Sequence, residues 1–372
     1  MEPKSLRERV DVRIATELDR RLVDRLAAGG GRSRRVARVG AFLMATGVHL
    51  ATIGLLALGL VLLVLGDNWV QRLLAIPALL PPAVLLIPRR SDETLEQVVP
   101  AAAPEFTALL GELTEALGSA PPTYVAIDAD INASAERRGI RERRLVLGAP
   151  LWAALGPQGR IALLGHELGH FANGDVVHGR YVWWSTRSLY RWIDLVTPDG
   201  LISTEGRIPV FATIITAPIR LPLIGYLGLM WKVNAAASRH DELRADTASA
   251  ALAGTPGAVE CLETLLLVDI IDVAANRAAV DARRPDLAVE IRAKIDGVSE
   301  AARRALPTKG DESSVDRSHP RTEVRLRLQE SLPEVPPRFV LDEARWAAID
   351  AELRPMMDAS LKRMADGYRY IW

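Results

Sequence analysis

The feature that most constrains this chain is a run of 28 residues, from Val39 to Gly66, without one formally charged side chain. A helix that crosses the hydrocarbon core of a bilayer needs roughly 20 such residues. A cleaved signal peptide would have an apolar region of about 7–15 residues close to the start of the chain, whereas 38 residues rich in arginine precede this run. The run therefore predicts a transmembrane helix.

A second uncharged run, from Leu73 to Pro88, begins six residues after the first and is short and interrupted by prolines. The two runs together predict a transmembrane helical hairpin over residues 39–90. Eleven Lys or Arg residues precede the hairpin and Arg89 and Arg90 end it, whereas its turn carries only Arg72. Cytoplasmic flanks carry such an excess of basic residues. We therefore expect a multi-pass protein of the cell membrane whose remaining residues are cytoplasmic.

A third apolar stretch, from Ile208 to Trp231, has Arg220 at its centre and contains three residues expected to break a helix, Pro209, Pro218 and Pro222. Membrane contact is favoured for this stretch, and a buried or interfacial segment stays open. The preceding residues 181–196 mix Trp and Tyr with Arg, which is typical of a helix at the membrane interface.

Composition excludes several classes of function. The 46 basic and 46 acidic side chains give a net charge of zero, which argues against a nucleic-acid partner. The single cysteine, Cys261, excludes an intrachain disulfide and a zinc site built from several thiolates. Any bound metal would have to use His, Asp or Glu.

The rest of the chain predicts an α+β protein, mainly α with a small β-sheet. Residues 5–27 carry an apolar residue every fourth position and precede a Gly-rich tether, which predicts an amphipathic helix covered by a partner helix, the enzyme itself or lipid headgroups. Later patterns predict helices over 105–117, 258–272, 274–295 and 342–365, strands over 123–127 and 144–147, a loop over 298–318 and a linker over 333–337.

The sharpest chemical signal is His166-Glu167-Leu168-Gly169-His170, which lies in a stretch with helical periodicity. Residues four apart share one face of a helix, so both imidazoles can bind one zinc ion while Glu167 reaches its open coordination position. This spacing is typical of metal-assisted hydrolases.

Two histidines leave a catalytic zinc one protein ligand short. Glu242 lies on a second helical pattern, and Asp246, one turn later on the same face, could accept the free ring N–H of a ligating histidine. His240 and Asp241 are rival ligands that rank below Glu242.

These motifs, together with Ser318-His319-Pro320-Arg321-Thr322-Glu323-Val324-Arg325, resemble the membrane-embedded zinc endopeptidases that include bacterial HtpX and the CAAX-prenyl endopeptidases. The resemblance implies a zincin-like domain with a gluzincin site, whose ligands are His166, His170 and Glu242 and whose base is Glu167. It implies that His319 and Arg325 face the cleft and aid substrate or oxyanion binding. It also implies that the edge of the active-site groove is formed by Asn132, Ala133, Ser134 and Ala135.

The resulting domain prediction is a cytoplasmic amphipathic helix and tether over 1–38, the hairpin over 39–90, a metalloprotease domain over 91–332 with a hydrophobic insert at 176–233, and a linker and helix over 333–372. We expect one Zn²⁺ per chain and hydrolysis of peptide bonds by a water that Glu167 deprotonates. The expected substrates are misfolded or membrane proteins. A non-catalytic zinc-binding scaffold and a CAAX-type processing protease are the alternatives.

Overall fold

A computed structural model describes residues 31–86, 95–138, 142–197, 210–281, 283, 286–305 and 322–370. The predicted amphipathic helix over 5–27 and the candidate residue His319 lie outside these ranges. The described part is mainly helical with one four-stranded sheet, which confirms the α+β class. It forms two compact units. The apolar unit comprises 31–92 and 177–238, and the sheet unit contains 93–176 and 239–372.

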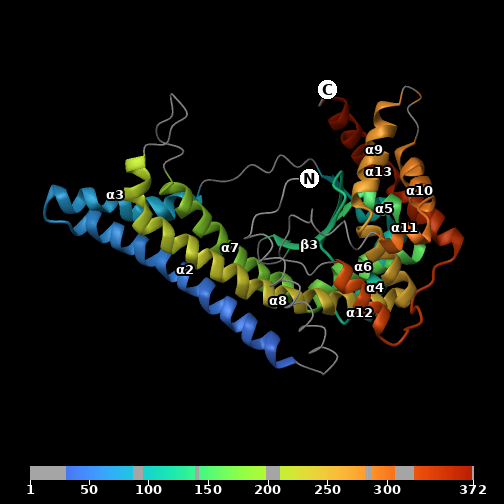
Figure 1. Cartoon of the computed structure of the whole chain (residues 1–372), viewed down its shortest axis with the longest axis horizontal. Helices are drawn as coiled ribbons and strands as arrows, with labels where there is room; N and C mark the ends of the chain where they lie inside the picture. The colour runs from blue at the N-terminus through green and yellow to red at the C-terminus, as the bar shows by residue number, and fades with distance from the viewer. Residues whose placement is uncertain are drawn as a thin grey trace. The chain divides into compact units, whose positions relative to one another are not determined.

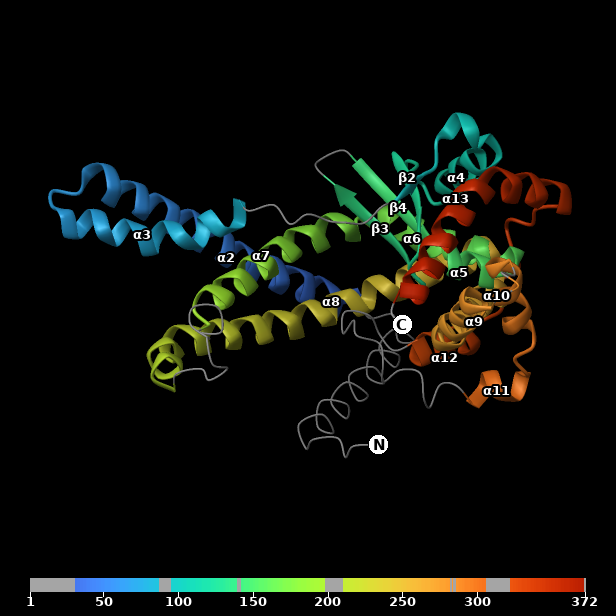
Figure 2. The ribbon, with the colours of Figure 1, turned by 90° about the horizontal axis from the view of Figure 1, so that it is seen from above.

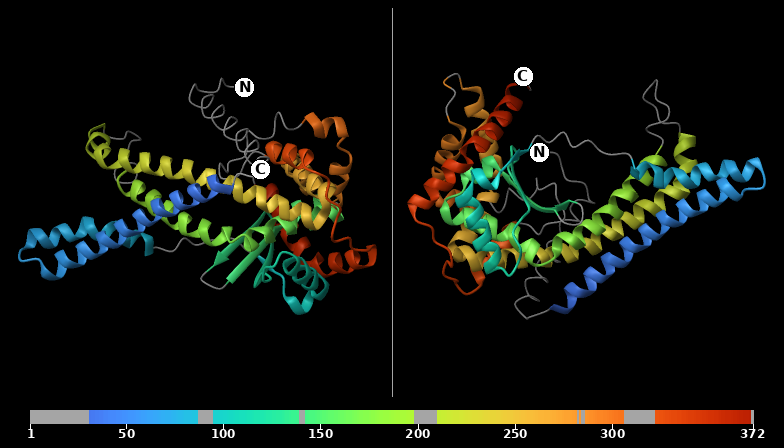
Figure 3. Two further views of the ribbon diagram at one scale, coloured as in Figure 1. Left: turned by 90° about the horizontal axis from the view of Figure 1, so that it is seen from below. Right: turned by 180° about the vertical axis from the view of Figure 1, so that it is seen from behind.

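Four helical segments lie side by side in the apolar unit (Figures 1 and 3). They are α2 (Gly31–Leu65), α3 (Trp69–Ala83), which continues into η1 (Val84–Leu86), most of α7 (Asp175–Leu195), and the first part of α8 (Val210–Leu265). The turn between α2 and α3 is fixed by side chains, because the amide of Gln71 donates to Asn68 at 3.0 Å and that of Asp67 donates to the Gln71 side chain at 2.7 Å. The two uncharged runs therefore form a helical hairpin.

The prolines of this unit do not end its helices. Three prolines lie inside α3, and α8 continues through Pro218 and Pro222, so the expected break in the third apolar stretch was wrong. Each proline removes one backbone hydrogen bond. In a bilayer no water would satisfy the groups freed by ending the helix, so continuing it is the less costly choice.

Small side chains fill the interior of the apolar unit. Ala41 and Ala45 of α2 are 0% exposed, whereas large side chains of the same helix, such as Leu60 and Val64, point outward. Two helices are long and apolar enough to cross a membrane by length and composition, over Arg35–Leu65 and within Ile214–Leu265.

The sheet unit has strands β1 (Glu96–Gln97), β2 (Tyr124–Asp128), β3 (Ala133–Arg138) and β4 (Glu142–Gly148) in the order β1-β2-β4-β3. β2 and β4 are parallel with Tyr124 opposite Arg144, whereas β3 is antiparallel to β4 with Ala133 opposite Leu147. β3 is therefore an edge strand of this sheet, and it packs beside α6 (Figure 2).

Helices surround this sheet. They are η2 (Pro100–Ala102), α4 (Pro104–Ala116), α5 (Ala149–Ala154), α6 (Pro157–Ala172), the second part of α8, α9 (Val268–Val280), α10 (Leu287–Asp296), α11 (Glu300–Ala305), α12 (Thr322–Ser331) and α13 (Glu343–Tyr370). The single helix expected over 274–295 is instead divided between α9 and α10. The reason is Asp286, whose carboxylate accepts the amides of Ala288 and Val289 and starts α10 as its N-cap.

The core of the sheet unit joins its first and last segments. Trp152 of α5 makes edge contacts with Phe106 of α4 and Trp346 of α13, at ring-centroid distances of 5.9 Å and 6.4 Å. Ile349 and Leu353 of α13 belong to the same buried cluster. The C-terminal helix is thus part of the core of this unit.

Two helices that begin with proline are capped by distant side chains. Neither α4 nor α6 has a side-chain cap at its own N-cap residue. The Glu352 carboxylate of α13 accepts the amides of Glu105 and Phe106, both at 3.0 Å. The Glu260 carboxylate of α8 accepts the amides of Gly156 and Gly159 at 2.7 Å and 3.1 Å. Each carboxylate also lies at the positive end of a helix dipole.

Candidate metal centre

The site is built where α6 crosses the second part of α8 at very short range. A Cβ atom at Gly169 would lie 3.0 Å from the Cβ of Ala248 and 3.3 Å from the Cα of Ala245, and one at Gly165 would lie 3.1 Å from the Cα of Ser249. Because these glycines have no side chain, the helix backbones approach closely. The approach brings a carboxylate of α8 to the histidines of α6.

Three side chains converge at this crossing. The Nε2 atoms of His166 and His170 are 3.3 Å apart, and the Glu242 carboxylate lies 3.4 Å from the first and 3.5 Å from the second. Nitrogen ligands roughly 2.0–2.1 Å from a tetrahedral zinc ion would be about 3.3 Å from each other. Among the described residues, these three form the group of side chains that could hold a metal ion. Their donor set and spacing therefore fit zinc.

The orientation of His166 is fixed from behind. Its Nδ1 lies 3.0 Å from Oδ1 of Asp246, so a proton on Nδ1 leaves Nε2 as the atom that faces His170 and Glu242. Burial and Arg325 disfavour a charged ring, but hydrogen bonds to Asp246 and Glu242 outweigh them and raise the pKa of His166 to about 10. The carboxylates that favour a proton on this ring equally favour a bound cation.

Arg325 occupies a different place from the one the resemblance implied. Its side chain is buried, and its Nε and Nη2 donate to the two carboxylate oxygens of Asp246 at 2.8 Å and 2.6 Å. Its Nη1 is 3.5 Å from Glu242. Burial would raise the pKa of Asp246, but Arg325 and His166 more than offset this and hold it at about 2. Arg325 therefore lies behind the ligands and does not face a cleft, because its guanidinium is committed to these carboxylates.

The other candidates are placed less directly. Glu167 is buried on α6 next to the ligand His166. The rival ligands His240 and Asp241 are also buried on α8 but do not belong to the three-residue group. His319 lies outside the described residues, so its predicted role at the cleft stays a prediction.

The stretch Asn132–Ala135 begins the edge strand β3. The Gly148 amide donates to the Asn132 carbonyl at 2.8 Å, which fixes the alternation of bonds to β4. Since antiparallel pairs alternate, Ser134 bonds to β4, whereas the backbone groups of Ala133 and Ala135 point to the free edge. A Cβ on Gly148 would lie 1.9 Å from the Asp130 carbonyl, so the loop before β3 requires glycine there.

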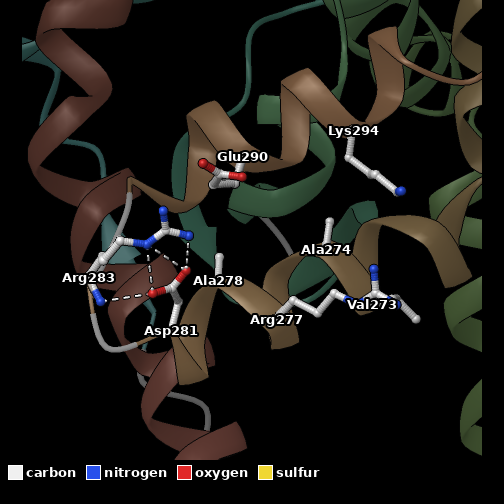
Figure 4. A pocket seen from close by; sticks show the side chains of 8 residues that line it. All are labelled: Val273, Ala274, Arg277, Ala278, Asp281, Arg283, Glu290 and Lys294. Atoms are coloured by element: carbon white, nitrogen blue, oxygen red, sulfur yellow. Dashed lines mark hydrogen bonds and ion pairs between the residues drawn. The ribbon is translucent and has the colours of Figure 1, made fainter.

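A cavity of about 380 Å³ in the sheet unit lies away from this centre (Figure 4). It is lined from α9 and α10, and at one end Arg283 donates from Nη2 to Asp281 at 2.8 Å. None of the three candidate ligands lines it, so the cavity is not the metal centre.

Sequence analysis missed the residues that position the centre. Gly165 and Gly169 were passed over, although glycines four apart on a helix signal a close helix crossing. Glu260, which caps α6 two turns before His166, gave no local signal because its partners lie 101 and 104 residues away.

Comparison with known proteins follows this geometry. Residues 100–331 match the family described as Peptidase family M48. A protein named protease HtpX homolog from Thiobacillus denitrificans is 29% identical over 151 residues, which cover 39% of this chain and 50% of that protein. Protease HtpX from Pseudomonas entomophila is 34% identical over 113 residues, which cover 28% and 36%. The chain thus matches half or less of the length of these relatives.

Proposed function

The chain belongs to peptidase family M48, and on that premise we propose that it is a membrane-bound, zinc-dependent endopeptidase. The observation that carries the proposal is the triangle of His166, His170 and Glu242, whose separations of 3.3 to 3.5 Å suit a tetrahedral zinc ion. One zinc ion per chain would be held there, with Glu167 beside it as the general base.

When bound, zinc lowers the pKa of a water molecule to about 7 and polarises a peptide carbonyl. Glu167 accepts the proton of the attacking water and returns it to the leaving amine. Asp246 keeps the proton of His166 on Nδ1, and Arg325 holds Asp246 in place through two hydrogen bonds. The mechanism thus needs only one proton carrier, and the other buried charges serve to orient the ligands.

The proposed substrates are extended segments of unfolded polypeptides. The free edge of β3 offers the backbone groups of Ala133 and Ala135 to such a segment, which would add a strand to the sheet. Main-chain bonds are insensitive to sequence, so specificity would be broad. Broad specificity and candidate membrane spans suit a role in the quality control of membrane proteins.

The proposal is tested with full-length protein, metal analysis and cleavage of an unfolded membrane protein and of casein. We expect about one zinc per chain, and Glu167→Gln should keep the zinc while slowing cleavage by about 10²–10⁴-fold. Glu290→Gln, an exposed carboxylate of α10, is the control. Wild-type cleavage by Glu167→Gln would refute the mechanism. Zinc binding without cleavage by the unaltered protein would support the scaffold alternative.

The cytoplasmic placement of the sheet unit is part of the proposal and has its own test. In a Cys261→Ser background, Asp67→Cys places a thiol in the hairpin turn, and Val340→Cys places one at a residue that is 70% exposed in the sheet unit. A membrane-impermeant thiol reagent added to intact cells should label position 67 only. Labelling of position 340 instead would place the centre outside the cytoplasm.

A further inference from the structure

Helix α7 presents two contrasting faces within the apolar unit. Val182, Leu189 and Trp192 are buried on one face, against α2 and α8. The other face exposes Trp183 by 54%, Tyr190 by 46% and Trp184 by 38%, which is unusual for side chains of this size.

Arg187 lies among the exposed rings. Its guanidinium carbon is 5.4 Å from the centre of the Trp183 ring and 5.2 Å from that of Trp184, and the two indoles meet edge to face at 5.4 Å. Both distances are within the range of a cation–π interaction. Stacking leaves the guanidinium N–H groups in the ring plane able to donate to an anion, since arginine has five of them. We call Trp183, Trp184, Arg187 and Tyr190 the α7 cluster.

The start of α7 is held against the N-terminal part of α2. The ring of Tyr181 stacks on Phe42 at 4.8 Å, and its hydroxyl lies 2.9 Å from the Thr46 hydroxyl. Its carbonyl lies 3.3 Å from Nε2 of His49. These contacts are with the end of α2 that carries Arg35 and Arg38, and not with the end at the hairpin turn.

The last turns of α7 are held at the C-terminal end of α3. Arg191 donates to the Val84 carbonyl at 2.5 Å, and Trp192 donates to the Pro81 carbonyl at 3.3 Å. The second apolar run ends at Pro88 and Arg89 and Arg90 follow it. Both ends of α7 are therefore attached to the basic end of the hairpin, where a spanning hairpin would leave the bilayer.

We infer that the α7 cluster is a binding site for the phosphate of an anionic phospholipid headgroup, which rests on the membrane anchoring proposed above. The three aromatic rings suit the interfacial region, because each has an apolar body and a polar group. Arg187 supplies the complementary charge and a planar set of donors for phosphate oxygens. The cluster would hold α7 in the headgroup layer beside the hairpin.

The position of the cluster is tested by site-directed spin labelling of full-length Cys261→Ser protein in nanodiscs that contain phosphatidylglycerol. Tyr190→Cys reports on the cluster, Leu56→Cys on the outer face of α2, and Val340→Cys on water. Relative accessibility to oxygen and to a nickel chelate should place position 190 at the headgroups, position 56 in the hydrocarbon and position 340 in solution. A reading at position 190 equal to either reference would overturn the inference. An aqueous reading at position 56 would refute the membrane anchoring itself.

Binding is tested by titrating short-chain phosphatidylglycerol into the detergent-solubilised full chain. Arg187→Gln should raise the dissociation constant about fivefold, the effect of one cation near an anionic lipid surface. Replacing Trp183 and Trp184 by alanine should weaken binding as well. Arg277→Gln, which removes one positive charge from α9, should leave the constant unchanged. Equal losses in Arg187→Gln and Arg277→Gln, or no loss in the first, would overturn the site.

Discussion

The two units of this chain place charged and apolar side chains in opposite positions. The sheet unit buries four ionisable side chains at one point, His166, Glu242, Asp246 and Arg325. The apolar unit buries alanines and directs leucine and valine outward. The comparison teaches that hydrophobicity alone does not identify a core residue, because the surrounding solvent decides which side of a helix is the inside.

Different forces therefore hold the units together. In the sheet unit, the removal of apolar surface from water stabilises a core large enough to contain a fully paired cluster of charges. In the apolar unit, close packing of small residues and a few hydrogen bonds between helices must do so, such as the one from the Tyr226 hydroxyl to the Met44 carbonyl at 2.8 Å. Substitutions should expose this difference.

The largest effect is expected from breaking the buried charge cluster. Arg325→Met should destabilise the sheet unit by about 3–5 kcal/mol, because it leaves the Asp246 carboxylate buried without its cation. Urea denaturation of the zinc-free protein in detergent measures the change. Arg327→Met on the same helix is the control, since Arg327 is 74% exposed and should contribute less than about 1 kcal/mol. Equal stability of the two variants would contradict the paired-cluster account.

The next effect compares one substitution in both units. Ile53→Arg places a charge on the outer face of α2, where Ile53 is 61% exposed, and should disfavour membrane insertion by about 2.5–3.5 kcal/mol. Val340→Arg, at an equally exposed residue of the sheet unit, should change stability by less than about 0.5 kcal/mol. The inserted fraction after alkaline extraction measures the first and thermal unfolding the second. Similar outcomes at both positions would mean that both units face water.

A smaller effect separates the orienting residue from the ligands. Asp246→Asn should weaken zinc affinity by about 10–100-fold, because His166 keeps its ligand atom and loses its charged partner. Competition with a chromogenic chelator measures the affinity, and Glu242→Ala should lose zinc altogether. Unchanged affinity in Asp246→Asn would remove Asp246 from the metal centre.

The smallest effect tests the capping of helices across the sheet unit. Glu352→Ala should cost about 0.5–2 kcal/mol, because two amides of α4 lose their acceptor. Asp358→Ala on the same helix is the control, since its carboxylate is 59% exposed and pairs only with Arg354 in the described part of the chain. Denaturant midpoints of both variants decide whether the distant cap contributes.

The sequence predicts well what depends on neighbouring residues. The two uncharged runs became α2 and α3, and Glu167 and both histidines lie on one helix because their spacing matches its period. Strands over 124–128 and 142–148 lie close to the expected 123–127 and 144–147. The helix over 343–370 starts one residue after the expected position.

What depends on distant residues could not be read in advance. Arg325 was expected at a cleft, yet its partner Asp246 lies 79 residues earlier, and nothing local marks that pairing. Prolines were taken as helix ends in α8, because their cost was judged as in water and not as in an apolar surrounding. Both differences arise from tertiary context overriding local preference.

The long separation within the buried cluster also sets an order of events during synthesis. His166 and Arg325 are 159 residues apart in the chain. At about 5–20 residues per second, translation takes roughly 8 to 30 s to reach Arg325 after His166 has been made. During that interval Asp246 has no guanidinium partner, so the finished arrangement of ligands cannot yet exist. The centre is completed only once the last third of the polypeptide has been translated, by which time the hairpin helices have long left the ribosome.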